Sequence, residues 1–126
     1  MKYELRDFDL ALIAYFDAMK ADYSKWTKGV TGFGGYDVTA DKPGSKFVRI
    51  IHTSSGGQRS SHSFIVLKDC EVTKSAPLYS KKPKEVLKLR AGDILKCASW
   101  RAPALNFVRG NILDGNYGKC AWTGAA

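Results

Sequence analysis

The sequence predicts an α+β fold, in which an N-terminal amphipathic helix packs on a small, strongly bent antiparallel sheet or a partly open β-barrel. Three observations lead to this prediction. Apolar residues recur at helical spacing early in the chain, short β-rich segments follow, and clusters of turn formers separate those segments. With 126 residues the chain has the length of one domain. We therefore assign residues 1–126 to a single domain.

The predicted helix covers about residues 7–28. Large apolar residues spaced three or four positions apart place one stripe along it: Leu5, Phe8, Leu12, Phe16, Met19, Tyr23 and Trp26. Ile13 and Tyr15 widen this stripe. Asp7 or Asp9 can cap the start, and Gly29 is a suitable end. We expect the stripe to pack on the sheet, with a partner-binding or dimer face as the alternative.

A glycine-rich connection is expected at residues 29–45, either flexible or a loose hairpin. Within it, residues 32–35 (GFGG) superficially resemble a phosphate-binding loop. They lack the Lys-Ser/Thr ending that such a loop needs, which argues against a nucleotide site there.

The β body is predicted at residues 46–124 and begins with a hairpin. Residues 46–53 (KFVRIIHT) and 62–68 (HSFIVLK) are rich in β-branched and aromatic residues, and residues 54–61 between them are turn formers with one Arg. A second hairpin is expected from residues 85–89 and 94–99 around a tight turn. Further candidate strands are residues 104–109 and a closing strand at 119–122.

Positive charge is concentrated in this β body. Residues 1–45 carry 6 basic and 7 acidic residues, whereas residues 46–126 carry 14 basic and 5 acidic ones. A basic segment that also contains aromatic residues is the usual electrostatic footprint of a protein that binds a polyanion. The distribution therefore predicts an anionic partner.

Two blocks and a short helical element carry a resemblance to a known family. They are residues 56–66 (GGQRSSHSFIV), 92–112 (GDILKCASWRAPALNFVRGNI) and 15–17 (YFD). In these blocks the chain resembles a family of small uncharacterised proteins encoded by tailed bacteriophages, over roughly residues 5–25 and 44–124. The resemblance implies a phage source and expression in the host cytoplasm, and it supplies no activity to carry over.

The first candidate site is the tip of the first hairpin with its flanks. Turn N–H groups and an arginine fork suit one anionic group; the alternative is an ordinary polar loop. The members are His52, Ser54, Ser55, Gln58, Arg59, Ser60, Ser61 and His62. The two histidines could face each other and act as acid and base in RNA cleavage, but we expect each to be a strand-end residue bonded to backbone.

The second candidate site interleaves aromatic residues with Arg and Asn, as single-strand binding platforms do. Its members are Lys96, Trp100, Arg101, Asn106, Phe107, Arg109 and Asn111. We expect Phe107 to be a core residue, and the pattern leaves Trp100 open between core and surface. Across both sites, the residues predicted to bind nucleic acid or another anion are Arg49, Gln58, Arg59, Ser60, His62, Lys96, Trp100, Arg101, Asn106 and Arg109.

Other chemistries have little support in the sequence. The chain has no GxSxG nucleophile elbow and no CxxC pair among its three cysteines, so we expect no catalytic residue, metal or cofactor. The cysteines are expected to be reduced thiols, with Cys97 buried and inert. No run of apolar residues is long enough to span a membrane, and the N-terminus lacks a secretory pattern, which favours the cytoplasm.

Together these features predict a small non-enzymatic protein that binds DNA or RNA through a basic face with aromatic residues. Two alternatives stay open. The chain could dock on an acidic host or phage protein as an interaction module or inhibitor, or it could bind a small anionic nucleotide.

Overall fold

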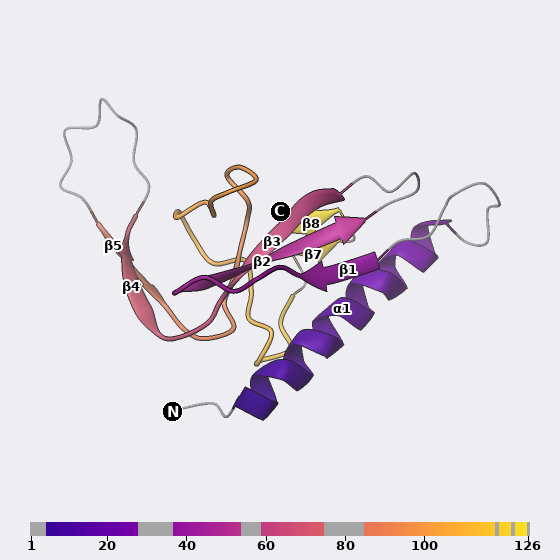
Figure 1. Cartoon of the computed structure of the whole chain (residues 1–126), viewed down its shortest axis with the longest axis horizontal. Helices are drawn as coiled ribbons and strands as arrows, with labels where there is room; N and C mark the ends of the chain where they lie inside the picture. Colours follow the sequence, from indigo (N-terminus) through magenta and orange to yellow (C-terminus); the bar gives the residue numbers. More distant parts are fainter. Residues whose placement is uncertain are drawn as a thin grey trace.

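The predicted α+β fold is confirmed. The computed structural model describes residues 5–27, 37–53, 59–74, 85–117, 119–121 and 123–125. One N-terminal helix, α1 (Leu5–Thr27), packs on a small antiparallel sheet that does not close into a barrel (Figure 1). Predictions for residues 28–36 and for the hairpin tip at 54–58 lie outside the described residues.

The main sheet has four strands in the order β1-β2-β3-β6, and all its neighbours are antiparallel. The predicted first hairpin is present as β2 (Phe47–Thr53) and β3 (Arg59–Val66). Edge strand β1 (Asp37–Ala40) falls in the stretch expected to be a connection, so that expectation was wrong there. Its four residues bury only one side chain, Val38, which is too short a pattern to predict a strand.

Apolar residues cover both faces of this sheet. One face packs on α1 through residues that include Val48, Ile50 and Ile65. Phe64 and Val66 belong to a second apolar cluster. Because neighbouring strand residues point to opposite faces, the alternation along β3 places the helix on one side of the sheet and the later chain on the other.

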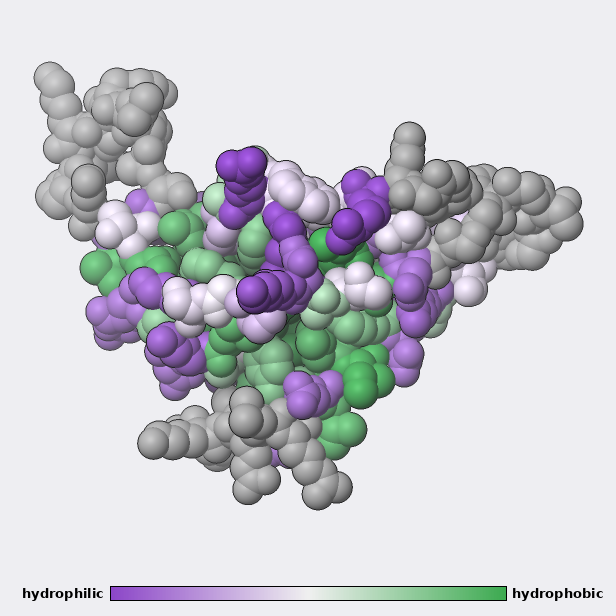
Figure 2. Space-filling model, in the orientation of Figure 1, coloured by the Kyte–Doolittle hydropathy of each residue, from purple (hydrophilic) through white to green (hydrophobic). Residues whose placement is uncertain are grey.

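The helix packs on the sheet as predicted, but its buried stripe is rotated. Tyr15 and Met19 are 0% and 2% exposed and lie in the core, whereas Phe16 is only partly buried. Ile13, which was expected to widen the stripe, is 55% exposed. Its neighbour on the same side of the helix, Leu10, is 56% exposed. Figure 2 shows hydrophobic residues along the exposed side of α1.

The predicted second hairpin was wrong. Strand β5 (Val86–Leu89) pairs with β4 (Cys70–Thr73), and β6 (Ile94–Leu95) pairs with β3. The tight turn at residues 90–93 does form, but it carries the chain from one sheet to the other. The β4–β5 hairpin, which we call the arm, projects to one side of the main sheet (Figure 1). Its core side chains pack on the second apolar cluster, and this tertiary contact decides the pairing.

The rest of the β body is mostly irregular. Residues 104–109 do not form the expected strand, but the chain there runs beside β6, with the Arg109 N–H donating to Ile94 O at 2.8 Å and the Ile94 N–H to Gly110 O at 2.9 Å. The predicted closing strand is present as β7 (Cys120–Ala121), which pairs with β8 (Gly124–Ala125). Within the described residues, no helix is long and apolar enough to cross a membrane.

Candidate functional site

Among the described residues, Trp100 and Phe107 are exposed aromatic side chains whose rings each lie against an arginine guanidinium. Trp100 is 40% exposed. The guanidinium carbon of Arg49, from β2, lies 4.1 Å from the ring centroid, and Nη1 of Arg49 donates to the Trp100 carbonyl oxygen at 2.8 Å. A guanidinium so placed attracts the ring face and restricts its motion. The ring is therefore held in place before any ligand arrives.

Arg49 is itself held by an acidic residue. Its Nη2 forms an ion pair with Asp41, just beyond β1. The pKa of Asp41 lies below its ordinary value, because the carboxylate accepts a hydrogen bond from the Lys42 backbone N–H and another from Arg49. Arg49 was predicted to contact an anion directly. With its charge engaged by Asp41, it acts instead as the support of Trp100.

Several other residues predicted for the binding sites are exposed. Lys96 and Arg101 flank Trp100 in sequence and are exposed, as predicted for surface residues. Arg59 and Ser60 are also exposed, but they belong to the start of β3, paired with Thr53 and His52, rather than to a loop tip. Gln58 lies outside the described residues.

Phe107 is the second exposed ring, so its prediction as a core residue was wrong. It is 48% exposed, and the guanidinium carbon of Arg109 lies 3.7 Å from its centroid. Arg109 is only 5% exposed and donates from Nη1 to the Asn106 side-chain oxygen and to the Phe107 carbonyl at 2.7 Å. Burial lowers the pKa of the Arg109 guanidinium below its ordinary value. Lys119, which sequence reasoning missed, places its ammonium 5.6 Å from the same ring.

An open pocket of about 290 Å³ adjoins Arg109 and Lys119. We call it the Arg109 pocket. Its walls come from the turn after β5 and from the chain between β6 and β7: Arg90, Asp93, Val108, Arg109, Gly110, Asn111, Asp114, Asn116 and Lys119.

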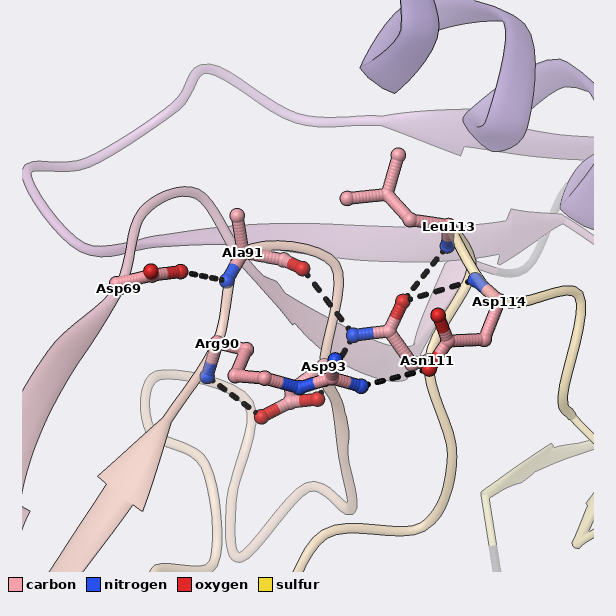
Figure 3. Close-up of polar contacts among 7 residues, drawn as sticks. All are labelled: Asp69, Arg90, Ala91, Asp93, Asn111, Leu113 and Asp114. Atoms are coloured by element: carbon pink, nitrogen blue, oxygen red, sulfur yellow. Dashed lines mark hydrogen bonds and ion pairs between the residues drawn. The ribbon is translucent and has the colours of Figure 1, made fainter. Parts of the chain in front are cut away.

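Asn111 fastens one wall of the Arg109 pocket (Figure 3). Its Nδ2 donates to Ala91 O at 3.1 Å and to the Asp93 carboxylate at 2.8 Å, while its Oδ1 accepts from the N–H groups of Leu113 at 2.8 Å and Asp114 at 3.1 Å. The residue is 3% exposed. Asn111 was predicted to belong to the binding platform, and this is corrected, because its whole amide is engaged inside the protein.

The predicted role of His62 in anion binding is also corrected. Ile50 pairs with Ser63 and Ile51 with Ser61, which leaves His62 as an extra residue in β3. Such a β-bulge breaks the alternation of side chains. His62 and Ser63 consequently both reach the helix side of the sheet, where they are 2% and 0% exposed.

A buried polar network surrounds His62. Its Nε2 lies 2.8 Å from Ala121 O, its Nδ1 lies 2.9 Å from Ser63 Oγ, and the Tyr15 hydroxyl lies 2.9 Å from that same Oγ. A carbonyl oxygen only accepts, so we assign the Nε2–H tautomer, in which Nδ1 accepts from a hydroxyl. This network joins α1, β3 and β7.

The two histidines do lie next to each other, with ring centroids 5.8 Å apart. Burial is the main cause that lowers the pKa of His62 to about 4, and burial also lowers the pKa of His52. His62 is bonded to backbone, as expected, but it lies inside β3 rather than at a strand end. It is closed to solvent, so it is not a surface group for acid–base chemistry on a bound phosphate, whereas His52 is only partly buried.

Removing the Tyr15 hydroxyl tests the network. We expect Tyr15→Phe to lower the free energy of unfolding by about 1 kcal/mol, because buried hydrogen bonds to Ser63 and His62 are lost while the ring remains. Urea denaturation measures it. Tyr117→Phe is the matched control, since that ring stacks edge-on against Tyr15 at 5.4 Å. An equal effect in both variants would contradict the assignment.

The side chains that could hold a metal and the three cysteines are further candidates for chemistry. No group of three or more His, Cys, Asp or Glu residues there is placed to hold a metal ion. Cys70, Cys97 and Cys120 are free thiols and partly buried, and burial raises the pKa of Cys97 and Cys120. Comparison of the chain with protein-family models, curated proteins and solved structures finds no match.

Proposed function

We propose that this chain is a small, non-enzymatic, phage-encoded protein that binds single-stranded nucleic acid. The observation that carries the proposal is the pair of exposed rings, Trp100 and Phe107, each stacked on a guanidinium at 4.1 Å and 3.7 Å. Sequence-tolerant binding of single strands depends on such aromatic platforms within a positively charged surface.

The geometry makes these rings suitable for stacking. A ring that a guanidinium already holds loses little side-chain freedom when a base stacks on it. Stacking of one base on an aromatic side chain is worth about 1–3 kcal/mol. Lys96, Arg101 and Arg59 are exposed, so their charges are available for phosphate contacts. This favours unpaired bases over a duplex, whose bases are not free to stack on protein rings.

Replacing Trp100 tests the proposal. We expect Trp100→Ala to weaken binding of labelled single-stranded oligonucleotides roughly tenfold, as the loss of one stacked base predicts, and Trp100→Phe to retain most of the affinity. Fluorescence anisotropy measures both. Leu10→Ala is the control, because it removes a comparably exposed apolar side chain from α1.

Salt provides the second readout. If about 4–6 phosphates are neutralised, log K should fall against log salt with a slope of roughly −3 to −5. The Trp100 variants should keep this slope, because stacking involves no ion release. Absence of binding at low salt, or an equal loss of affinity in Trp100→Ala and Leu10→Ala, would contradict the proposal.

A further inference from the structure

The Arg109 pocket differs from the stacking surfaces because several cationic residues line one open hollow. Arg90, Arg109 and Lys119 line it together with two carboxylates, Asp93 and Asp114. Arg90 forms an ion pair with Asp114 at 2.6 Å. The lining as a whole keeps a net positive charge, which favours an anionic occupant.

Both carboxylates of the pocket are committed to its wall. Asp93 is 5% exposed, and its two oxygens accept from the Arg90 backbone N–H at 2.7 Å and from Asn111 Nδ2 at 2.8 Å. These bonds fix both acidic groups in place (Figure 3). The two carboxylates of the lining therefore have partners within the protein, and Arg109 and Lys119 add positive charge to the same lining.

Arg109 and Lys119 are both close to an aromatic ring. Both cations approach the Phe107 ring, one at 3.7 Å and the other at 5.6 Å. An anion in the pocket lies beside the exposed Lys119 and the buried Arg109, and a planar group attached to it would extend out of the lining toward the Phe107 ring that both cations approach. Planar guanidinium donors match phosphate oxygens well.

The pocket volume sets the size of the ligand. About 290 Å³ lies at the lower end of small-molecule sites, which suits one nucleotide-sized group rather than a polymer. A phosphate monoester carries a charge of about −1.5 to −2 near neutral pH, more than the single charge of an internal phosphodiester. Among nucleic acids and their building blocks, a phosphorylated chain end or a free nucleotide presents such a group.

We propose that the Arg109 pocket binds a phosphate monoester, supplied either by the phosphorylated end of a nucleic-acid strand or by a free nucleoside monophosphate. The strand-end source rests on the proposed function, whereas the free nucleotide does not. Lys119, which is exposed, holds the phosphate, the buried Arg109 adds positive charge to the pocket, and Phe107 contacts the attached base.

The test compares oligonucleotides of one sequence that carry a 5′-phosphate, a 3′-phosphate or hydroxyl groups at both ends. We expect at least one phosphorylated form to bind roughly tenfold more tightly, as one charge-assisted hydrogen bond would give. Adenosine monophosphate should compete with this preference, and adenosine should not.

Lys119→Gln locates the effect, because Lys119 is exposed and its loss spares the core. We expect this variant to lose most of the end preference and Lys119→Arg to restore it. Lys88→Gln, which removes an exposed charge from the arm, should keep the preference. Thermal unfolding checks that each variant is folded.

The outcomes separate the two proposals. Equal affinity for phosphorylated and hydroxyl ends, without binding of adenosine monophosphate, overturns the pocket and leaves the nucleic-acid function standing. Binding of the mononucleotide alone supports the pocket and overturns the nucleic-acid function. If the preference for a phosphorylated end survives in Lys119→Gln, the phosphate binds elsewhere on the protein and the proposed site is wrong.

Discussion

Replacing Asn111 with alanine is expected to lower the free energy of unfolding by about 3 kcal/mol, because several buried polar groups would lose their partners at once. The side chain makes four hydrogen bonds inside the protein, to Ala91, Asp93, Leu113 and Asp114. A single buried polar group left without its partner costs about 1–3 kcal/mol. The stranded groups lie in two turns that Asn111 joins, one at residues 91–93 and the other at residues 112–115.

The turn that Asn111 fastens leaves no room for compensation. Gly92 has a φ of 90°, and a Cβ there would lie 2.9 Å from Asn111 Oδ1, so the turn and the amide are fitted to each other. Asn111→Asp should be worse than alanine, because it adds a second carboxylate beside buried Asp93. Chemical denaturation measures each variant.

Asn116→Ala is the matched control for Asn111, because Asn116 lines the same pocket from an exposed position. It should change the free energy of unfolding by only a few tenths of a kcal/mol. A comparable loss in both variants would show that Asn111 is not the fastening point.

Stability is expected to fall by about 3 kcal/mol between neutral pH and pH 4 through His62 alone. Burial holds the pKa of this residue at about 4, against an ordinary value of 6.5. Between pH 6.5 and pH 4, His62 is therefore protonated in the unfolded chain and neutral in the folded protein. The contribution is fully present above pH 6.5 and is lost as the pH falls toward 4.

The groups around His62 sharpen the measurement. His52 faces it at 5.8 Å, and its pKa is lowered in the same direction, so part of the acid response belongs to that residue. Asp41 adds to the loss of stability only below its ordinary pKa of 3.8, because protonation there removes its ion pair with Arg49.

His62→Gln removes the titration while keeping a donor for Ala121. We expect this variant to be less stable at neutral pH and to have a much flatter dependence on pH between 6.5 and 4. His52→Gln should flatten it less. Denaturant titrations at several pH values provide the data, and an unchanged slope in His62→Gln would contradict the role given to burial.

The fold was predictable where the pattern is local. Helical spacing located α1, and β-branched runs located β2 and β3, because these residues bury one face in regular periods. The pairing of β5 with β4 was not predictable from spacing. Leu89 and Leu95 both join the cluster around Phe64, so packing across the chain chose the partner strands.

The candidate site was predictable in part. Residue types indicated Arg101 and Lys96 as surface residues and left Trp100 open between core and surface, and no sequence pattern links Trp100 to Arg49, 51 positions away. The burial of His62 depends on a single extra residue in β3, and a one-residue change of register moves a side chain to the other face of a sheet. Alternation alone cannot anticipate it.

The arm has a consequence for how this fold can vary. The chain leaves the main sheet at Val66 and returns at Asp93, and these two points are bonded to each other. The Val66 N–H donates to Asp93 O at 2.9 Å, and the Gly92 N–H donates to Val66 O at 2.7 Å. The excursion between them is thus closed at its base. Segments of different length can be spliced in beyond the Thr73–Val86 pair without altering the sheet, which makes the arm the natural place for a graft, a label or an inserted domain.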